Sequence, residues 1–355
     1  MKVLLISQCP PPSGGIATWT KVYLNYMKNR ADMAITVVNC ALKGGRARNF
    51  NAKRNILAEL WRTFGIAFQI LAKSIKCKPD VIHLNSSCSP MGIIRDWLCV
   101  KLLPKHIPLI LHCHCSIANQ LGNNQRGIEF FKRVASRAQT ILVLNSDSQK
   151  WVSDVCEKKS EIIPNFIDDS EVVQKPHTIV GPINKVVYIG HLLETKGINE
   201  MMTIARKFPQ IDFVFAGSYT EDVEIILQAP NVKLLGDVAH DQVISLLDDA
   251  DLFLFLSYTE GFSISLLEAM ARGVPVLASD VGANRDMVEE FGGIIVPARD
   301  AKASICGFNQ MLKLAEKERR EMSDWEIKKV NEQYTTNSVL NKVIDIYQKV
   351  FAERK

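Results

Sequence analysis

A chain of 355 residues is too long for one ordinary hydrophobic core and predicts two domains of about 150 to 200 residues each. With 47% hydrophobic and 8% aromatic residues the chain can bury such cores, which excludes an intrinsically disordered protein. The net charge of +5 is unevenly spread, because residues 1–160 hold 23 Lys or Arg against 8 Asp or Glu, whereas residues 185–300 hold 8 against 18. We therefore expect two halves that face different partners, with a basic half suited to an anionic one.

The cysteines and the N-terminus indicate a cytoplasmic protein. Nine scattered cysteines, an odd number, are typical of reduced thiols rather than of a disulfide framework. The apolar run that begins at Lys2 ends before Pro10, which is too short for a signal peptide. No run approaches the ~18 apolar residues of a membrane span, so we expect a soluble or peripheral protein.

Short apolar runs alternate with helical patterns along most of the chain, in the rhythm of a parallel, doubly wound sheet. The predicted strands of the first half are Lys2–Ser7, Ala34–Asn39, Val81–Leu84, Leu109–His112 and Thr140–Leu144. After a polar, proline-bearing pause, those of the second half are Lys185–Ile189, Phe213–Ala216, Val232–Leu235, Leu252–Leu256 and Val274–Ala278. The pattern predicts two α/β domains at 1–168 and 185–335, joined by a linker at 169–184. We expect an amphipathic helix within residues 336–355 to pack on the first domain.

The loop after the predicted strand Leu252–Leu256 is the strongest candidate site. Ligands of open parallel sheets bind beyond the carboxyl ends of the strands, and this loop places Gly261 near the start of a helix. Backbone N–H groups and the helix dipole there favour a phosphate. Spacing alone leaves two interpretations of Glu268 open: a carboxylate that binds ligand, or the last residue of a capping box that begins at Ser265.

Glu260 and Glu268, with Gly261-Phe262 after the first and the sequence from Ala269 to Val276 after the second, resemble the signature of the family 4 retaining glycosyltransferases. The resemblance covers nearly the whole chain, and it implies the GT-B fold, in which two Rossmann-like domains face a cleft. The second domain would hold the nucleotide, and the first would bind most of the acceptor. Further motifs follow in the family's order: Pro12 to Gly15, Pro79 to His83, Pro108 to His114, Pro164 to Asp168, Gly190 with Lys196-Gly197, Gly282, and Gly292-Gly293.

The resemblance also implies roles for individual residues. Glu268 would bind the two ribose hydroxyls, because an ionised carboxylate accepts two hydrogen bonds at once. Glu260 would contact the donor sugar, and Lys196 would neutralise the diphosphate as it departs. His114 would face the donor sugar from the first domain, so the implied catalytic residues are Glu260, His114 and Lys196. The other implied donor-binding positions are Gly14, Gly15, His191, Val238, Gly261, Phe262, Ser263, Ile264 and Ser265.

The implied reaction moves a sugar, with retention of configuration, from a nucleotide diphosphate sugar to a saccharide or polyprenyl-linked acceptor. UDP is favoured as the commoner donor class of the family, and the product would be a cell-surface polysaccharide or glycolipid. The resemblance implies no cofactor and no metal. Three positions depart from the family pattern: His191 replaces its usual arginine, Phe166 its glycine and Ser265 its proline. The first departure would weaken diphosphate binding.

Three alternatives stay open beside the transferase. A nucleotide-sugar epimerase of the same fold should need acid–base carboxylates in the first domain, whose loops offer histidines and amides instead. A non-catalytic sugar-nucleotide-binding protein fits the same nucleotide site. RNA binding by the basic half is disfavoured, because no aromatic RNA-binding motif accompanies it. A metal cluster at His112–Cys115 is also disfavoured, because only alternate side chains of a strand share a face.

Residues 43–78 predict a membrane-facing surface, because they hold nine Lys or Arg against Glu59 alone, a charge of +8. We expect docking on an anionic membrane at its inner face, although a solvated basic face fits the same composition.

The helix predicted over residues 56–76 would carry this surface. Its outward side would hold Ile66 and Ile70 beside Arg62 and Lys73, an arrangement typical of an interfacial helix. Its core stripe would be Leu57, Leu60, Phe64, Phe68 and Leu71.

Overall fold

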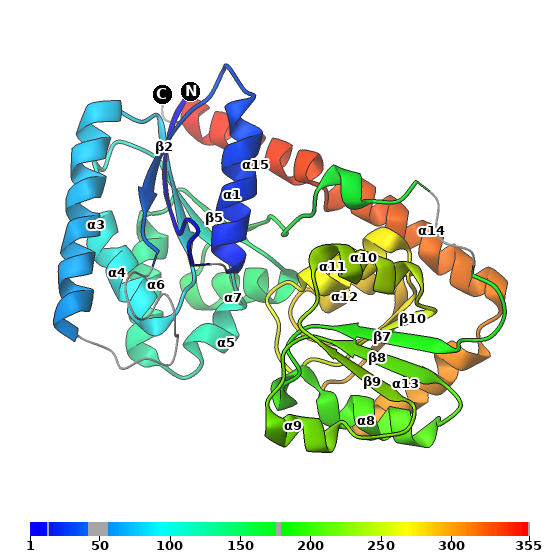
Figure 1. Cartoon of the computed structure of the whole chain (residues 1–355). Coiled ribbons are helices and arrows are strands. Elements are labelled where there is room, and N and C mark those ends of the chain that lie inside the picture. The colour runs from blue at the N-terminus through cyan, green and yellow to red at the C-terminus, as the bar shows by residue number, and fades with distance from the viewer. Residues whose placement is uncertain (13, 42–55, 175–178, 354–355) are drawn as a thin grey trace. The chain divides into compact units, whose positions relative to one another are not determined.

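The computed structural model describes the chain except residues 13, 42–55, 175–178 and 354–355, and it leaves the side chains of residues 56–60 undescribed. The chain forms two compact units. Unit 1 comprises Met1–Pro164 together with Leu340–Lys355, and unit 2 comprises Asn165–Val339. Each unit contains a six-stranded parallel sheet with helices on both faces (Figure 1). The predicted fold class, α/β with two Rossmann-like parallel-sheet domains, is confirmed.

The sheet of unit 1 has the strand order β2-β1-β3-β4-β5-β6. The five strands predicted from apolar runs are all present, whereas β6 has only two residues and leaves no periodicity to detect. The strands are β1 (Lys2–Ser7), β2 (Ala34–Asn39), β3 (Val81–Ser86), β4 (Leu109–Cys113), β5 (Thr140–Val143) and β6 (Glu161–Ile162).

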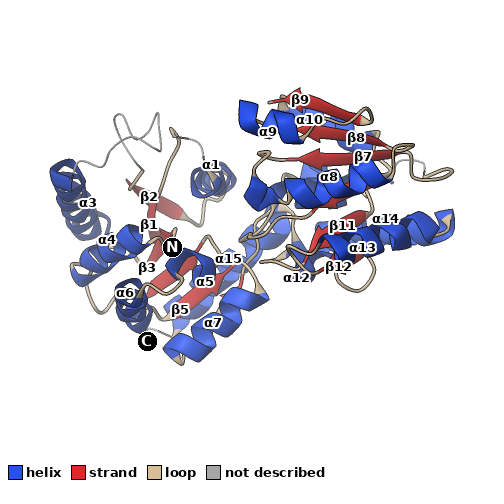
Figure 2. Ribbon diagram, turned by 90° about the horizontal axis from the view of Figure 1, so that it is seen from below, coloured by secondary structure: helices blue, strands red, loops and turns tan. Residues whose placement is uncertain are grey.

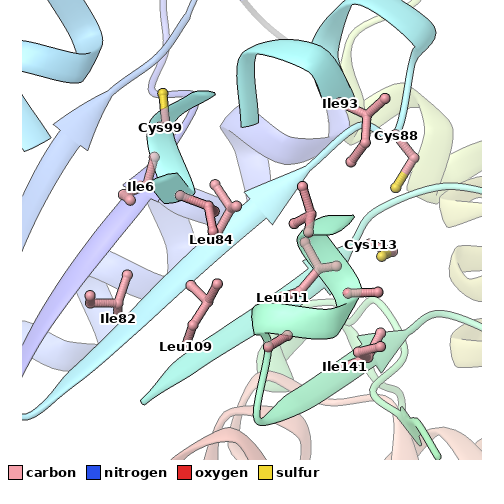
Figure 3. Packing of buried hydrophobic residues seen from close by; sticks show 14 of the residues in the cluster. Ile6, Ile82, Leu84, Cys88, Ile93, Cys99, Leu109, Leu111, Cys113 and Ile141 are labelled. Atoms are coloured by element: carbon pink, nitrogen blue, oxygen red, sulfur yellow. The ribbon is translucent and has the colours of Figure 1, made fainter. Parts of the chain in front are cut away.

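Helices cover both faces of this sheet, with α3, α4 and α6 on one face and α1 and α15 on the other (Figures 1 and 2). Alternate residues of each strand point to opposite faces. Leu84 and Leu111 therefore pack in the cluster under α3, α4 and α6 (Figure 3), whereas His83 and His112 face α1 and α15. The helices are α1 (Gly15–Lys28), α3 (Ile56–Cys77), α4 (Pro90–Lys101), α5 (Ile117–Leu121), α6 (Gln125–Arg137), α7 (Ser146–Cys156) and α15 (Thr336–Ala352).

A buried hydrogen-bonded chain ties α15 to the sheet of unit 1. The hydroxyl of Tyr347 lies 2.5 Å from His83 Nδ1 and 3.0 Å from the hydroxyl of Tyr23. His83 Nε2 lies 3.2 Å from His112 Nδ1. Burial lowers the pKa of His83 to about 3 and holds that of His112 well below its ordinary value, so both rings are neutral.

The sheet of unit 2 has the strand order β12-β11-β10-β7-β8-β9, which reverses direction between β7 and β10. All five predicted strands are present, and β12 is an addition. The strands are β7 (Lys185–Ile189), β8 (Asp212–Ala216), β9 (Val232–Gly236), β10 (Leu252–Phe255), β11 (Val276–Ser279) and β12 (Gly293–Val296).

The helices of unit 2 pack in two layers. On one face α8 and α13 meet through Phe208 and Phe308, whose ring centroids are 4.9 Å apart, and α10, α11 and α14 lie on the other face (Figure 1). The helices are α8 (Ile198–Lys207), α9 (Glu221–Ile226), α10 (His240–Asp248), α11 (Ile264–Arg272), α12 (Asn284–Val288), α13 (Ala301–Lys313) and α14 (Glu316–Gln333), with 3-10 turns η1 (Asp169–Glu171) and η2 (Glu194–Lys196).

The described residues of the segment predicted as a linker, 169–174 and 179–184, belong to unit 2, and the boundary between the units falls after Pro164 rather than after residue 168. Val172 and Ile183 are buried. The backbone N–H of Val173 donates to the carbonyl of Ala271 at 3.2 Å. The polar composition of this segment gave no sign of these contacts. A few buried apolar side chains and backbone hydrogen bonds are enough to hold an irregular segment against a domain.

Helix α3 is present where it was predicted, but the prediction of its faces was wrong. Ile66 and Ile70 are buried in the core cluster, whereas Phe64 and Phe68 are 66% and 71% exposed. Leu71 is also exposed, at 39%, and the side chains of Leu57 and Leu60 lie outside the described residues. Apolar residues occur on both sides of this helix. The side with Ala67 and Ser74 beside the two isoleucines has smaller side chains and lies closer to the sheet.

The two cations expected on the outer face of α3 point to the sheet instead. Arg62 Nη1 donates to the carbonyl of Cys40 at 3.0 Å, and Lys73 Nζ donates to the carbonyl of Val37 at 2.6 Å. Both cations therefore bind backbone carbonyl groups in β2 or just after it. Among the described residues, no helix has the length and apolarity to cross a membrane, and all nine cysteines are free thiols.

Candidate active site

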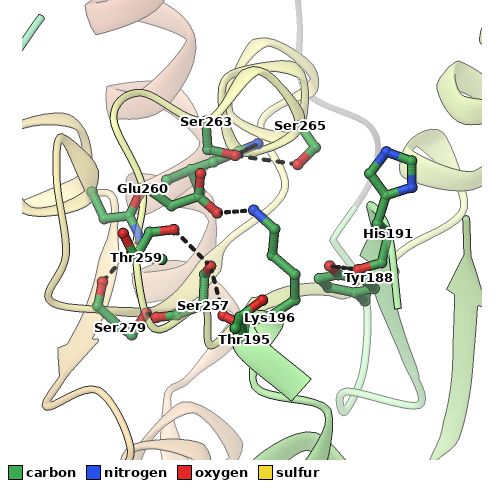
Figure 4. Close-up of polar contacts among 12 residues, drawn as sticks. Tyr188, His191, Thr195, Lys196, Ser257, Thr259, Glu260, Ser263, Ser265 and Ser279 are labelled. Atoms are coloured by element: carbon green, nitrogen blue, oxygen red, sulfur yellow. Dashed lines mark hydrogen bonds and ion pairs between the residues drawn. The ribbon is translucent and has the colours of Figure 1, made fainter. Parts of the chain in front are cut away.

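The candidate site lies at the carboxyl ends of β7 and β10, where the strand order of unit 2 reverses (Figure 4). Helical connections leave two such strands in opposite directions, and ligands of open parallel sheets bind at such a reversal of the strand order. The loop after β7 carries Gly190, His191 and Lys196, and the loop after β10 carries Ser257 to Ser263. The topology therefore brings together residues that lie more than sixty positions apart in sequence.

Lys196 and Glu260 form the centre of the site. Lys196 Nζ lies 2.5 Å from Glu260 Oε1, and the two side chains are 26% and 12% exposed (Figure 4). The backbone N–H of Tyr258 donates to the carbonyl of Thr195 at 2.8 Å, which ties the two loops together beside this pair. A partly buried lysine whose ammonium is held by one carboxylate oxygen keeps its other N–H bonds available for an anionic ligand.

Two glycines allow the loops to approach so closely. Gly197 has φ +78°, and a Cβ there would lie 2.0 Å from the carbonyl oxygen of Leu256. Gly282 has φ +58°, and a Cβ there would lie 2.3 Å from the carbonyl oxygen of Glu260. Any larger residue would push Lys196 and Glu260 away from their present positions.

The N-terminus of α11 is capped by Ser263, whose Oγ accepts a hydrogen bond from Leu266 N at 3.2 Å. Ser265 lies one residue inside the helix, and its Oγ is 3.2 Å from that of Ser263. The capping box proposed for Ser265 and Glu268 is therefore wrong. Glu268 extends from the second turn of α11, and the first turn presents its backbone N–H groups and the positive end of the helix dipole to the loop.

Glu268 belongs to a cluster with His240 and Glu171. His240 Nδ1 lies 3.7 Å from Glu268 Oε1, and His240 Nε2 lies 3.4 Å from Glu171 Oε2. Burial raises the pKa of Glu268 to about 7, an effect that His240 opposes and Glu171 reinforces. Within the described residues these three form the one group of His, Cys, Asp or Glu close enough to hold a metal ion.

Sequence reasoning missed His240 and Glu171. The position of His240 offered a signal, because it is the first residue of α10 and follows the end of β9. Glu171 offered none, because it reaches the cluster from the segment that was predicted to be a linker.

The remaining donor-binding candidates of unit 2 lie around this centre. His191 is exposed, and the Oγ of Ser218 lies 2.6 Å from His191 Nδ1. Val238 is half-buried in the loop between β9 and α10. Phe262 is buried, with its ring centroid 5.6 Å from that of Tyr334, so only its backbone is available to a ligand. Ile264 is exposed in the first turn of α11.

Three candidates belong to unit 1. Gly14 is the N-cap of α1 and Gly15 its first residue, and among the described residues, apart from the chain neighbours and the backbone of α1 itself, no atom lies within 4 Å of where a Cβ would be at either position. His114 follows β4, and its backbone N–H donates to the carbonyl of Ser86 at 2.9 Å. Its ring lies 3.9 Å from that of His112 and 5.1 Å from that of Trp19.

The His114 side chain is neutral. Burial lowers its pKa to about 3, and its buried Nε2 has no hydrogen-bond partner among the described residues. A neutral imidazole with an unsatisfied nitrogen can donate or accept a hydrogen bond, but it supplies no positive charge at neutral pH.

Comparison with known proteins gives the family. The model of Glycosyltransferase Family 4 matches residues 13–171, and the model of Glycosyl transferases group 1 matches residues 169–328. The chain belongs to the family 4 glycosyltransferases. Both glutamates and Lys196 lie within the second match, and Gly14, Gly15 and His114 lie within the first.

Curated members of the family are distant from this chain. It is 26% identical over 238 residues to the putative teichuronic acid biosynthesis glycosyltransferase TuaC of Bacillus subtilis, an alignment that covers 63% of the chain and 59% of that protein. It is also 26% identical over 212 residues to the alpha-galactosylglucosyldiacylglycerol synthase of Streptococcus pneumoniae, with 54% and 55% covered. These matches span somewhat more than half the length of the relatives.

Solved structures of other proteins share the fold of this chain. Sucrose-phosphate synthase from Thermosynechococcus elongatus superposes with a TM-score of 0.79 at 16% identity, over 99% of both chains. Anabaena HepE in complex with UDP and glucose superposes with a TM-score of 0.73 at 16% identity, over 98% of this chain and 100% of that one. The predicted GT-B fold is thereby confirmed.

Proposed function

We propose that this family member transfers a sugar from a nucleoside diphosphate sugar, with UDP as the favoured nucleotide, to a saccharide or lipid-linked acceptor. The product would belong to a cell-surface polysaccharide or glycolipid. The observation that carries the proposal is the Lys196–Glu260 pair beside the N-terminus of α11, with Glu268 in the second turn of the same helix.

Each part of this arrangement fits one part of the donor. Lys196 and the backbone N–H groups of the first turn of α11 would bind the diphosphate, since both present positive charge. Glu260 would hold Lys196 in place and accept hydrogen bonds from the sugar. Glu268 would accept bonds from both ribose hydroxyls, and Val238 would contact the base. UDP is favoured because HepE, which shares the fold, has been solved with UDP and glucose.

The reaction would retain the configuration of the sugar. The bond from the anomeric carbon to the diphosphate oxygen breaks, and its electron pair leaves with the phosphate. The acceptor oxygen forms its bond on the same face, and its proton passes to the departing phosphate oxygen. Lys196 stabilises the charge that develops on the phosphate. His114, being neutral, would contribute a hydrogen bond to the donor sugar, and no resident metal or cofactor is required.

The charge of unit 1 and the names of two relatives support this acceptor and location. The name of the synthase of Streptococcus pneumoniae contains a glycosyldiacylglycerol, and the name of TuaC contains teichuronic acid biosynthesis. The strongly basic first 160 residues suit either an acidic acceptor or an anionic membrane. We accordingly place the enzyme in the cytoplasm, peripheral on the inner face of the membrane, with no nucleic acid as partner.

The test uses the full chain with a panel of nucleotide sugars and no added acceptor. We expect slow release of UDP from one UDP-sugar, a release that Lys196→Ala abolishes while the nucleotide still binds. With an acceptor, the anomeric coupling constant in the proton NMR spectrum of the product should match that of the donor. Binding without release would indicate a non-catalytic protein, and an altered sugar still attached to UDP would indicate an epimerase. Either result contradicts the proposal.

A further inference from the structure

An exposed apolar stripe runs along the outer side of α3, and we call its residues the α3 ridge. Trp61, Phe64, Phe68 and Ile75 are 77%, 66%, 71% and 66% exposed, and Leu71 is 39% exposed. Successive members are three or four residues apart, so they line up on one side of the helix over about 21 Å. Such a contiguous set of large apolar side chains marks a surface that contacts something other than water.

The ridge is distinct from the face that builds the core of unit 1. Ile66 and Ile70 point the other way and pack in the cluster between α3 and the sheet. The opposite side of α3 therefore already covers the sheet, and the ridge takes no part in the core packing of unit 1. α3 lies on the outer side of that layer, next to α4 (Figures 1 and 2).

Exposed lysines lie at the C-terminal end of the ridge. Lys76 lies near the C-terminal end of α3 and Lys78 just beyond it, and both are exposed. The neighbouring helix α4 ends in exposed Lys101, next to Leu102, which is 45% exposed. Residues 43–78 carry a charge of +8 in the sequence, but residues 43–55 lie outside the described part of the chain, and Arg62 and Lys73 point to the sheet. A second copy of this chain would bring the same positive charge to the interface, which disfavours self-association through this face.

We propose that the α3 ridge inserts into the head-group region of an anionic lipid bilayer and docks unit 1 on that surface. A helix that lies in the interface presents aromatic and aliphatic residues to the acyl boundary and cations to the lipid phosphates. Trp61 at one end and the lysines at the other provide both. The proposal deepens the membrane location proposed above by assigning its element, and it replaces the face of α3 that the sequence favoured.

The test measures flotation of the full-length protein with vesicles of phosphatidylcholine alone or mixed with phosphatidylglycerol. We expect binding to the anionic vesicles only, and weaker binding as salt rises. Phe64→Ser with Phe68→Ser should lower the partition coefficient about twenty-five-fold, since withdrawing each ring from the interface is worth about fivefold. Lys76→Gln with Lys78→Gln should lower it about thirtyfold, since each lysine near the anionic surface is worth about 1 kcal/mol.

Matched controls separate the ridge from general hydrophobicity and from catalysis. Ile225 and Phe291 in unit 2 are 69% and 65% exposed, so Ile225→Ser with Phe291→Ser removes comparable apolar surface and should leave flotation unchanged. Glu268→Ala should also float normally, since docking does not involve the donor site. Because the substituted side chains of the ridge, of the two lysines and of the unit 2 control are exposed, the melting temperature of these variants should stay that of the wild type.

Several results would overturn the proposal. If the wild-type protein does not float with anionic vesicles, or floats equally well with neutral ones, an anionic lipid surface is not the partner. If the ridge variants float like the wild type, the ridge is not the docking surface. A wild-type dimer that the ridge substitutions convert to a monomer would identify the ridge as an interface between copies of the chain instead.

Discussion

The titration of Glu268 predicts that donor binding depends on pH. In the proposed complex the ribose hydroxyls donate to the ionised carboxylate, but burial raises the pKa of Glu268 to about 7, so near neutral pH about half of the molecules should carry the protonated form. Binding that requires ionisation should be about elevenfold weaker at pH 6 than its limit, and nearly at that limit at pH 8. On this proposal, binding of the donor releases the proton of Glu268.

Isothermal titration with an intact UDP-sugar is the suitable assay. Both of its phosphates are esterified on two sides, so neither has the second ionisation, near pH 6, of a terminal phosphate. Glu268→Gln should bind the donor at least tenfold more weakly at pH 8, because it loses two charge-assisted hydrogen bonds of about 1.5 to 3 kcal/mol each, partly compensated. Its affinity should also be almost independent of pH.

The control is Glu332→Gln, an exposed carboxylate at the end of α14. It should keep the affinity and the pH profile of the wild type. Wild-type affinity that stays constant between pH 6 and pH 8, or unchanged affinity in Glu268→Gln, would refute the ribose role of Glu268.

Four further predictions concern charge. Lys196→Ala should lower kcat by about a hundredfold or more in steady-state assays, because its charge matters most as the phosphate departs. His191→Arg should tighten donor binding at neutral pH by about threefold to tenfold in a nucleotide titration, and weaker binding would give His191 a role of its own. Burial raises the pKa of Glu326 well above its ordinary value, so its contribution to stability is present at low pH and is lost as pH rises; Glu326→Gln should therefore raise the melting temperature more at pH 8 than at pH 5. The pKa of His83 is lowered to about 3, so its contribution is complete above about pH 6.5 and falls by about 1.4 kcal/mol per pH unit below it, which denaturant titrations at pH 7 and pH 5 should reveal.

The strands of both units could be predicted because parallel, buried strands are short apolar runs and leave a clear trace in the sequence. Strand β6, with two residues, leaves no such trace, and its place in the sheet depends on its pairing with β5. The Lys196–Glu260 pair was foreseen only through family resemblance, since the two residues lie in different loops that the strand order brings together. Glu171 could not be predicted as a site residue, because its contact with His240 depends on tertiary packing alone.

The faces of α3 illustrate a different limit. Periodicity identifies a helix with apolar residues on two sides, but it cannot decide which side meets the sheet. The side with Phe64 and Phe68 carries more apolar residues at helical spacing than the side with Ile66 and Ile70, which favoured the wrong side. The structure selects the side with small neighbours, because a helix packs closely on a sheet only where its side chains are short.

The tie between Tyr347 and His83 also sets the order in which the chain can be completed during synthesis. The first 164 residues leave the ribosome long before residues 340–355, and until then no tyrosine fills the space beside His83 and Tyr23. Unit 2 is contiguous and has its whole sheet available earlier. The growing chain therefore carries a first unit whose face at His83 and Tyr23 is incomplete until its last residues are synthesised. A separately expressed first unit would need the last helix supplied as a peptide or joined directly after Pro164.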